Sequence, residues 1–273
     1  MKVVIFALAL LLGVLYPITA HAANIEHQAG SVLVMDARSG EIIFHTEGYA
    51  RRYPASVTKV MTALLVLERV SDLNEYMTFS ETAVDIPDYA SRVGITAGET
   101  ITVMQALYGN LLPSGNEIAR GLAEHVSGTA AEFVALMNQR AAQLGALNTN
   151  FVNPCGLPGD GQFTTAYDIA LIMREAIRHP VFVDIISTAY FTIPPTNLHD
   201  EPRQLRNTNR MIRPDQEQYS PHVVGGKTGF TNAAQHTLVS YVRRDDRELI
   251  ISVLYAPRLA TFSDTALLMD YFL

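Results

Sequence analysis

The sequence predicts an α+β fold, in which one antiparallel sheet is built from both chain ends and flanked by helices, with a helical region inserted between them. Runs of β-rich residues occur near the N-terminus and again in the C-terminal part of the chain, whereas apolar residues between them recur at helical spacing. Because the sheet needs both ends, we expect residues 23–273 to form a single domain, with the helical region around residues 72–165.

The N-terminal part of the sheet is predicted as a hairpin of two strands, residues 31–36 and 41–45, around a turn that contains Gly40. A helix is expected over residues 57–70, where apolar residues are three or four positions apart. Glycine and proline residues then divide the next segment into three predicted helices, at Glu99–Leu112, Asn116–Val126 and Ala130–Leu144.

The C-terminal part of the sheet is predicted from three further strands. A loop rich in Asn, Pro and Gly over residues 148–161 and an amphipathic helix over residues 167–178 come first. The expected strands follow at residues 222–226, 237–243 and 248–255, and a helix over residues 263–271 closes the chain.

Residues 1–22 have the features of a cleaved export signal. Lys2 supplies a positive start, residues 3–15 are apolar, and Ala20-His21-Ala22 gives a small-x-small cleavage site. The apolar run is shorter than the roughly 20 residues that cross a bilayer, although retention as an anchor is an open alternative. We therefore expect an exported protein, in the periplasm or on the outer face of the cytoplasmic membrane.

Composition excludes several classes of function. The net charge of −7 and the pI near 5.6 argue against a nucleic-acid partner. Cys155 is the only cysteine, so no internal disulfide is possible, and the eight histidines lack the spacing of metal ligands. We expect no metal and no cofactor.

Lysine is rare in this chain, which has three lysines and seventeen arginines. Outside the export signal, only Lys59 and Lys227 are present. Arginine holds its proton too tightly to act as a base, whereas a lysine that is buried or placed beside another cation can lose its proton. One interpretation is therefore that the two lysines take part in proton transfer. The other is that codon bias makes lysine rare and that these two lysines are present by chance.

Ser56 and Lys59 form a Ser-x-x-Lys motif at the start of a predicted helix, so their side chains project from one face. A serine nucleophile with a lysine base would suit this place, because a helix N-terminus supplies positive potential and free N–H groups. The lysine pKa would have to fall from about 10.4 toward neutrality, through partial burial and the nearby charge of Lys227. A capping serine followed by a solvated lysine is the simpler alternative, because the pattern is common by chance.

Two further motifs follow in order. Ser114-Gly115-Asn116 lies in the break between two helices, where a hydroxyl and an amide can relay a proton and hold a carbonyl, or can cap the helix. Lys227-Thr228-Gly229 lies on a strand, with Lys227 and Gly229 expected on one face and Thr228 on the other. The glycine would let a ligand backbone approach. A phosphate loop is excluded, because Pro221 stands where its leading glycine should be.

The ordered set of three motifs resembles that of the serine penicillin-binding enzymes and β-lactamases. Among these, the chain is most similar to the D-alanyl-D-alanine carboxypeptidases of the low-molecular-mass penicillin-binding proteins. The matching segments are Tyr53–Lys59, Leu111–Glu117, Asn148–Pro154, Thr164–Asp168 and Gly225–Thr231. The resemblance implies a β-lactamase/transpeptidase-like fold, peptidoglycan stem peptides as substrates, β-lactams as acylating inhibitors, and no cofactor or metal.

The resemblance also implies roles for individual residues. Ser56 is the acylated nucleophile, Lys59 its base, and Ser114 a proton relay to the leaving group. In substrate binding, Asn116 contacts the substrate amide and Lys227 contributes charge. Thr228 binds the terminal carboxylate, with Gly229 beside it. The backbone N–H groups of Ser56 and Phe230 form the oxyanion hole.

The chain departs from the family pattern in three respects. Relatives often have Ala-Gly near Ala234-Gln235, so Gln235 is unusual, and Cys155 is unusual in its loop. The C-terminal β-domain and the membrane helix of many relatives are not expected here, which leaves membrane association open.

Alternative functions also stay open. A D,D-endopeptidase and a non-catalytic penicillin-binding module are two of them. A class A β-lactamase is disfavoured, since residues 141–165 contain Asp160 but no glutamate to activate the deacylating water.

Overall fold

The computed structural model describes residues 25–273, so the predicted export signal at residues 1–22 lies outside the described part. The chain folds around a five-stranded antiparallel sheet in the order β2-β1-β9-β8-β7. These strands are β1 (Ser31–Asp36), β2 (Ile42–Thr46), β7 (Val223–Thr231), β8 (Gln235–Arg244) and β9 (Arg247–Ala256). The predicted α+β sheet built from both chain ends is confirmed.

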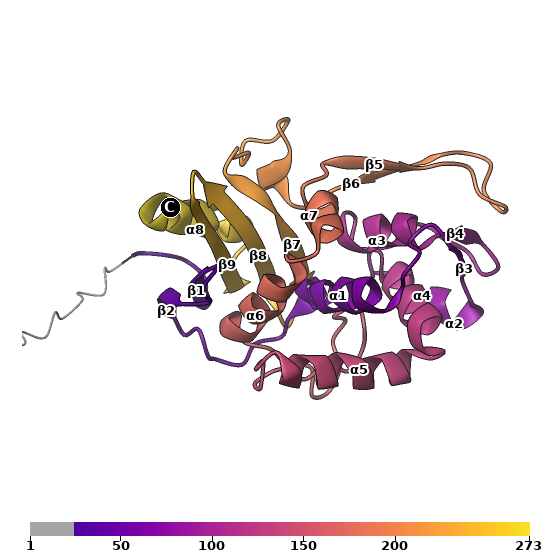
Figure 1. Ribbon diagram of the computed structural model, residues 1–273, viewed down its shortest axis with the longest axis horizontal. Coiled ribbons are helices and arrows are strands. Elements are labelled where there is room, and N and C mark those ends of the chain that lie inside the picture. The colour runs from indigo at the N-terminus through magenta and orange to yellow at the C-terminus, as the bar shows by residue number, and fades with distance from the viewer. Residues whose placement is uncertain (1–24) are drawn as a thin grey trace, which may run out of the picture.

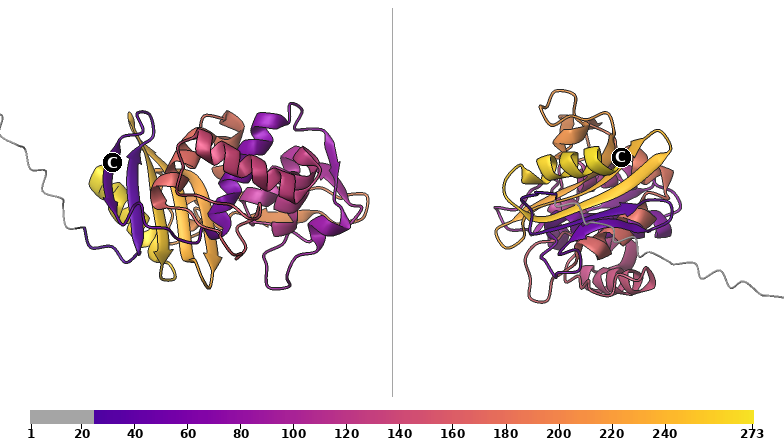
Figure 2. Two further views of the ribbon diagram at one scale, coloured as in Figure 1. Left: turned by 90° about the horizontal axis from the view of Figure 1, so that it is seen from below. Right: turned by 90° about the vertical axis from the view of Figure 1, so that its left-hand side faces the viewer.

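The sheet is the middle layer of the molecule. The closing helix α8 (Ala260–Phe272) covers one face, and α6 (Ala166–Ala176) and the helical region cover the other (Figures 1 and 2). Strand β1 is buried on both faces: Leu33 packs in the core on the helical side, and Val32 in the core under α8. Its near-continuous apolar sequence follows from this double burial.

The helical region is organised around α1 (Lys59–Arg69), which is preceded by a 3₁₀ turn at Ala55–Thr58. Residues Lys59 to Val66 are all buried, because α1 is surrounded by neighbouring helices. Its neighbours are α3 (Val103–Leu111), α4 (Asn116–Ser127), α5 (Ala130–Gln143), α6 and α7 (Pro180–Ile186). The residues just before α1 are thereby held between this helical region and the sheet.

The predicted helix Glu99–Leu112 is wrong at its start. Residues Thr100–Thr102 form strand β4, which pairs with β3 (Tyr76–Thr78) beside the short helix α2 (Glu81–Val84), and helix α3 begins only at Val103. Thr102 ends the strand and caps the helix, because its side chain and that of Gln105 form a reciprocal capping box. The inserted region is therefore not purely helical.

Two further elements were not predicted. The hairpin of β5 (Tyr190–Ile193) and β6 (Arg203–Arg206) extends from the sheet side along the helical region, and α7 precedes it (Figure 1). The hairpin strands are four residues each and partly exposed, so they lack a long apolar pattern. Nevertheless, this hairpin brings Arg203 to the helical region.

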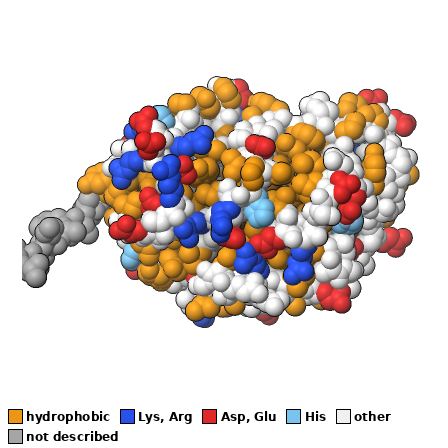
Figure 3. Space-filling view, viewed as in Figure 1, with side chains coloured by type: hydrophobic (Ala, Val, Ile, Leu, Met, Phe, Trp, Pro, Cys, Tyr) orange, Lys and Arg blue, Asp and Glu red, His pale blue; other side chains and the backbone are white. Residues whose placement is uncertain are grey.

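The described helices include none that is both long and apolar enough to cross a membrane. On the face shown in Figure 3, basic side chains gather over the half that contains the sheet, with acidic side chains among them. Arg38 and Glu248 form an ion pair in the described part of the chain, with side chains 2.8 Å apart.

Candidate active site

Ser56 lies in the 3₁₀ turn between the sheet and α1, directly against strand β7. A Cβ atom at Gly229 would come within 2.7 Å of the Ser56 backbone nitrogen and 2.5 Å of the Thr237 hydroxyl. Only glycine therefore lets β7 pass this turn. The sequence analysis predicted that Gly229 lets a ligand backbone approach the strand. The structure shows that Gly229 also makes room for the protein's own turn at Ser56.

Lys59 is fully buried beneath Ser56, and three acceptors surround its nitrogen. Nζ donates to Ser56 Oγ at 3.2 Å, to Asn116 Oδ1 at 2.9 Å and to the Cys155 carbonyl oxygen at 2.9 Å. A neutral amine has two N–H groups and one lone pair. With the two shorter bonds retained by Asn116 and Cys155, the lone pair of the neutral amine faces the Ser56 hydroxyl.

Burial lowers the pKa of Lys59 to about 8, although the nearby Cys155 and Glu117 oppose the shift. The predicted fall toward neutrality is thus present, but its cause is complete rather than partial burial. The expected influence of one lysine on the other acts on Lys227. Its pKa lies well below the ordinary value, because it is buried and also feels the charge of Lys59.

Asn116 links Lys59 to a neighbouring loop. Its Oδ1 accepts from Lys59, and its Nδ2 donates to the backbone oxygen of Ser91 at 2.8 Å and to Ser91 Oγ at 3.1 Å. Ser91 Oγ in turn donates to the Ser114 carbonyl at 2.7 Å. The amide that was predicted to bind substrate therefore also positions the base, and Ser91 is a site residue that no sequence motif indicated.

Ser114 adopts a left-handed backbone with φ of +68°, in the break between α3 and α4. Its hydroxyl is buried and has no hydrogen-bond partner within residues 25–273. Buried hydroxyls without partners are unusual, and left-handed non-glycine residues concentrate at functional sites. Ser114 is also among the residues that line the cavity described next.

A cavity of about 760 Å³ opens between β7 and the helical region. Six of the eight predicted site residues line it: Ser56, Ser114, Asn116, Thr228, Gly229 and Phe230. Lys59 and Lys227 are buried behind this surface, where Lys227 Nζ donates to the Thr228 carbonyl at 2.8 Å. The structure therefore brings all three motifs to one site, although they are far apart in the sequence.

The cavity also contains arginine and histidine residues that the sequence analysis missed. Arg210, His236 and Arg258 line it, and no carboxylate is present among its described lining residues. Arg258 lies in the connection between β9 and α8, where Tyr255 and Leu259 both have positive φ values. None of these residues belongs to a recognisable spacing pattern, so only the three-dimensional fold reveals them.

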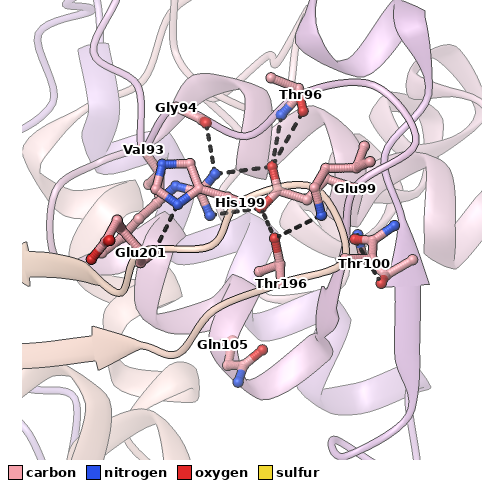
Figure 4. Close-up of polar contacts among 12 residues, drawn as sticks. Val93, Gly94, Thr96, Glu99, Thr100, Gln105, Thr196, His199 and Glu201 are labelled. Atoms are coloured by element: carbon pink, nitrogen blue, oxygen red, sulfur yellow. Dashed lines mark hydrogen bonds and ion pairs between the residues drawn. The ribbon is translucent and has the colours of Figure 1, made fainter.

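A buried ion pair fixes the loop that carries Ser91 (Figure 4). Glu99 accepts from Arg203 at 2.6 and 3.0 Å and from the Thr196 hydroxyl at 2.6 Å, and Arg203 also donates to the Gly94 carbonyl at 3.1 Å. Burial opposes ionisation of Glu99, but these hydrogen bonds outweigh it and hold the pKa of Glu99 below its ordinary value. The same loop is held from α4, since Glu117 accepts from the backbone N–H of Gly94 at 2.9 Å.

The two departures from the family pattern have local explanations. Gln235 begins β8 with φ of +52°, a conformation that glycine adopts without strain, and its side chain donates to the Asn232 carbonyl. Cys155 is buried, and its thiol donates to Asn153 Oδ1 at 3.3 Å. Its contribution to the site is its backbone carbonyl, which accepts from Lys59.

Known relatives match most of the chain. DacF of Bacillus subtilis, named a D-alanyl-D-alanine carboxypeptidase, is 32% identical over 86% of this chain, which spans 59% of DacF. DacB2 of Mycobacterium tuberculosis, of the same name, is 36% identical over 82% of this chain and 73% of its own length. A D-alanyl-D-alanine endopeptidase of Escherichia coli is 29% identical over 93% of this chain and 83% of its own length.

Solved structures agree with these relatives. A penicillin-binding protein homolog from Mycobacterium tuberculosis superposes with a TM-score of 0.84 at 32% identity, over 92% of this chain and 94% of its own. The Streptomyces K15 DD-transpeptidase superposes with a TM-score of 0.82 at 27% identity, over 90% and 97%. A model of the D-alanyl-D-alanine carboxypeptidase family matches residues 17–258. The chain therefore belongs to the D-alanyl-D-alanine carboxypeptidase family.

Proposed function

We propose that this protein is a serine D,D-carboxypeptidase that removes the terminal D-alanine from peptidoglycan stem pentapeptides through an acyl-enzyme on Ser56. The observation that carries the proposal is the placement of Lys59, whose nitrogen is 3.2 Å from the Ser56 hydroxyl and whose pKa is lowered to about 8 by burial. With this pKa, about a tenth of the molecules have a neutral amine at pH 7, compared with well under a thousandth for an unperturbed lysine.

In the first step, neutral Lys59 takes the Ser56 proton while Oγ attacks the carbonyl carbon of the penultimate D-alanine. The negative charge on the carbonyl oxygen is stabilised by the backbone N–H groups of Ser56 and Phe230. The Ser114 hydroxyl passes its proton to the departing amine and takes up the proton that Lys59 received from Ser56, so free D-alanine leaves and Lys59 is neutral again. Water then hydrolyses the ester on Ser56 and regenerates the serine.

The carboxylate of the terminal D-alanine would bind to the hydroxyl and guanidinium groups that line the cavity. Thr228 offers a hydroxyl there, whose oxygen is 2.5 Å from the Thr208 hydroxyl, and Arg210 and Arg258 line the same cavity. An arginine can bind a carboxylate through two parallel hydrogen bonds. Selection for a free terminal carboxylate is what distinguishes a carboxypeptidase from a general peptidase.

The proposal includes the setting of the reaction. Penicillins and other β-lactams would acylate Ser56 as substrate mimics. The predicted signal at residues 1–22 supports export, so the enzyme would act on peptidoglycan outside the cytoplasmic membrane.

The test is the release of free D-alanine from a peptide that ends in D-Ala-D-Ala. We expect release by wild type and by Ser71→Ala, which changes an exposed serine, and none by Ser56→Ala. Folded wild-type protein that releases no D-alanine would contradict the proposal.

A further inference from the structure

Thr208 connects two of the three motifs of the active site. Its hydroxyl oxygen is 2.5 Å from that of Thr228 and 3.2 Å from the Leu112 carbonyl oxygen. Thr228 belongs to the Lys-Thr-Gly motif, and Leu112 lies two residues before Ser114. Thr208 and Thr228 both line the active-site cavity. A residue that no sequence motif indicated therefore lies beside the hydroxyl that is proposed to bind the substrate carboxylate.

The segment that carries Thr208 is held in place from both sides. The Thr208 backbone N–H donates to the Leu112 carbonyl at 3.0 Å. Asn207 is buried, and its Nδ2 donates to the Thr188 carbonyl at 3.0 Å. Asn209 is also buried, and its backbone N–H donates to Asn207 Oδ1 at 2.9 Å. The Thr208 hydroxyl is thus positioned before any substrate binds, although Thr208 itself is exposed and lines the cavity.

The direction of the hydrogen bond between the two threonines depends on what else they contact. A threonine hydroxyl has one proton to donate and two lone pairs that accept. The Leu112 carbonyl can only accept, so when Thr208 donates to it, the contact with Thr228 must be made by the Thr228 proton. In that arrangement, Thr228 has no proton left for a bound molecule.

A bound carboxylate reverses this direction. An ionised carboxylate can only accept, so Thr228 must donate to it. The 2.5 Å contact then remains a hydrogen bond only if Thr208 donates to Thr228. The Leu112 carbonyl stays hydrogen-bonded, because it keeps the backbone N–H of Thr208. The two hydroxyls can therefore turn toward an anion without leaving a backbone acceptor unpaired.

We propose that Thr208 is a positioning residue that sets the preference of the enzyme for a free terminal carboxylate, which it recognises through Thr228. This inference rests on the proposed function, in which Thr228 binds that carboxylate. Donation from Thr208 polarises the Thr228 hydroxyl and makes it a stronger donor. A neutral terminal group gains less from this, since hydrogen bonds to ionised acceptors are about twice as strong as neutral ones. Thr208 takes no part in the proton transfers at Ser56.

The test compares two thioester substrates that differ only in the charge of the leaving group. Both have the same peptide ending in a D-alanyl acyl group, and the leaving thiol is mercaptoacetate in one and mercaptoacetamide in the other. Ser56 forms the same ester with either substrate, and a chromogenic thiol reagent measures the thiol that leaves. The ratio of the two kcat/KM values therefore isolates the contribution of the carboxylate.

The variants separate the hydroxyl from the rest of the side chain. Thr208→Val removes the hydroxyl and keeps the shape, whereas Thr208→Ser keeps the hydroxyl. Thr208→Ala also lacks the hydroxyl and adds no bulk, so a fold disturbed by valine does not decide the result. Thr46→Val is the matched control, because Thr46 is exposed on β2, at the opposite edge of the sheet from β7.

We expect wild type to prefer the mercaptoacetate substrate. Thr208→Val and Thr208→Ala should cleave it about fivefold to tenfold more slowly, judged by kcat/KM, while their cleavage of the mercaptoacetamide substrate stays within about twofold of wild type. Thr208→Ser and Thr46→Val should resemble wild type with both substrates. Retained cleavage of the neutral substrate shows that a variant is folded and that Ser56 is still acylated.

Several results would overturn the inference. Equal losses with both substrates would show that Thr208 affects the reaction itself, through the Leu112 carbonyl, and not the recognition of the carboxylate. No loss with either substrate would show that Thr228 does not depend on Thr208. An equal loss in Thr208→Ser would show that the hydroxyl is not the group responsible.

The outcome for wild type separates this inference from the proposed function. Wild type that releases D-alanine from a D-Ala-D-Ala peptide but cleaves both thioesters equally would overturn the carboxylate preference and leave the acyl-enzyme on Ser56 standing. Wild type that releases no D-alanine would overturn the proposed function as well.

Discussion

The charge of Lys59 contributes to lowering the pKa of Lys227, so the two buried amines of the site are electrostatically linked. Burial is the larger cause of the shift in both residues. The site therefore disfavours two positive charges at once, and the shift that the second charge causes falls on Lys227, whereas burial alone lowers the pKa of Lys59.

Activity should depend on pH through Lys59. The reactive form is the neutral amine and the pKa is about 8, so kcat/KM should rise with pH and level off above that value. Below the pKa, the slope should be about tenfold per pH unit. Initial rates of D-alanine release between pH 6 and 9 would measure it, with unfolding monitored over the same range. A flat profile would contradict the assignment of Lys59 as the base.

Lys59→Arg should abolish acylation even though it retains the positive charge. A guanidinium does not give up its proton, so the loss in the rate of penicillin acylation should be on the order of 10²–10⁴. The matched variant Lys227→Arg should lose less, about tenfold, because Lys227 is not the proposed acceptor of the Ser56 proton. Mass spectrometry of the acyl-enzyme gives both rates, and equal losses would mean that the two lysines do not have separate roles.

Penicillin should remain bound to Ser56 for a long time. A class A β-lactamase needs a glutamate beside the ester to activate water. Here none of the described residues that line the cavity is acidic, and Asp160 is exposed and lies outside that lining. We expect the mass of the acyl-enzyme to persist after excess drug is removed. Hydrolysis of a good penicillin at tens of molecules per second would contradict this expectation.

Breaking the Glu99–Arg203 pair should destabilise the protein strongly. Arg203→Met leaves the buried carboxylate of Glu99 without its main partner, at a cost of about 3–5 kcal/mol in the free energy of unfolding. Arg206→Met, at an exposed position of the same strand, is the control. Urea unfolding measures both variants, and similar midpoints for the two would refute the prediction.

The pH dependence of stability should follow from the same pair. The pKa of Glu99 is lower in the folded protein than in the unfolded chain, where it is about 4.3. The ionised carboxylate therefore stabilises the fold fully above about pH 4.3, and this stabilisation is lost as the pH falls through the lower pKa of the folded state. Wild type should therefore lose more stability than Arg203→Met between pH 5 and pH 3. Parallel loss in the two proteins would show that Arg203 does not hold this carboxylate ionised.

Gln235→Gly should stabilise the protein. Glycine relieves the strain of a left-handed backbone, which costs a non-glycine residue about 1–2 kcal/mol, although it gives up the side-chain bond to Asn232. We expect a net gain of about 1 kcal/mol in the free energy of unfolding. Gln235→Ala loses the same bond but keeps the strain, so it should not be more stable than wild type. A destabilised glycine variant would show that the bond matters more than the backbone conformation.

The sequence predicted the sheet well, because its strands carry long apolar runs. Strand β1 was predicted with its observed bounds, and β8 and β9 were predicted to within two residues, whereas β7 continues five residues beyond its predicted end. The strands that were missed, such as β5 and β6, are short and half exposed, and the start of α3 was misplaced because Thr100–Thr102 pairs with a distant strand. Pairing between distant segments leaves little trace in local sequence.

The site was predictable only where residues form ordered motifs. All eight predicted residues gather at the cavity or directly behind it. Ser91, Arg210 and Arg258 were missed, because each reaches the site from a separate segment of the chain that has no spacing pattern. The sequence also did not indicate that Gly229 makes room for the Ser56 turn or that Asn116 contacts Ser91. Both contacts join segments that are far apart in the sequence and meet only in the folded protein.

The position of β1 between β2 and β9 has a consequence for how the protein folds. Val32 pairs with Val253, so the N-terminal strand β1 can pair on this side only with β9, which lies more than 200 residues later in the sequence. Contacts of such long sequence separation form late, because the intervening loop must close first. During synthesis, the N-terminal hairpin cannot gain its second neighbour until residues beyond Arg247 have left the ribosome. Final assembly of the sheet, and with it the alignment of Ser56 against β7, is therefore expected to be a late and slow step of folding.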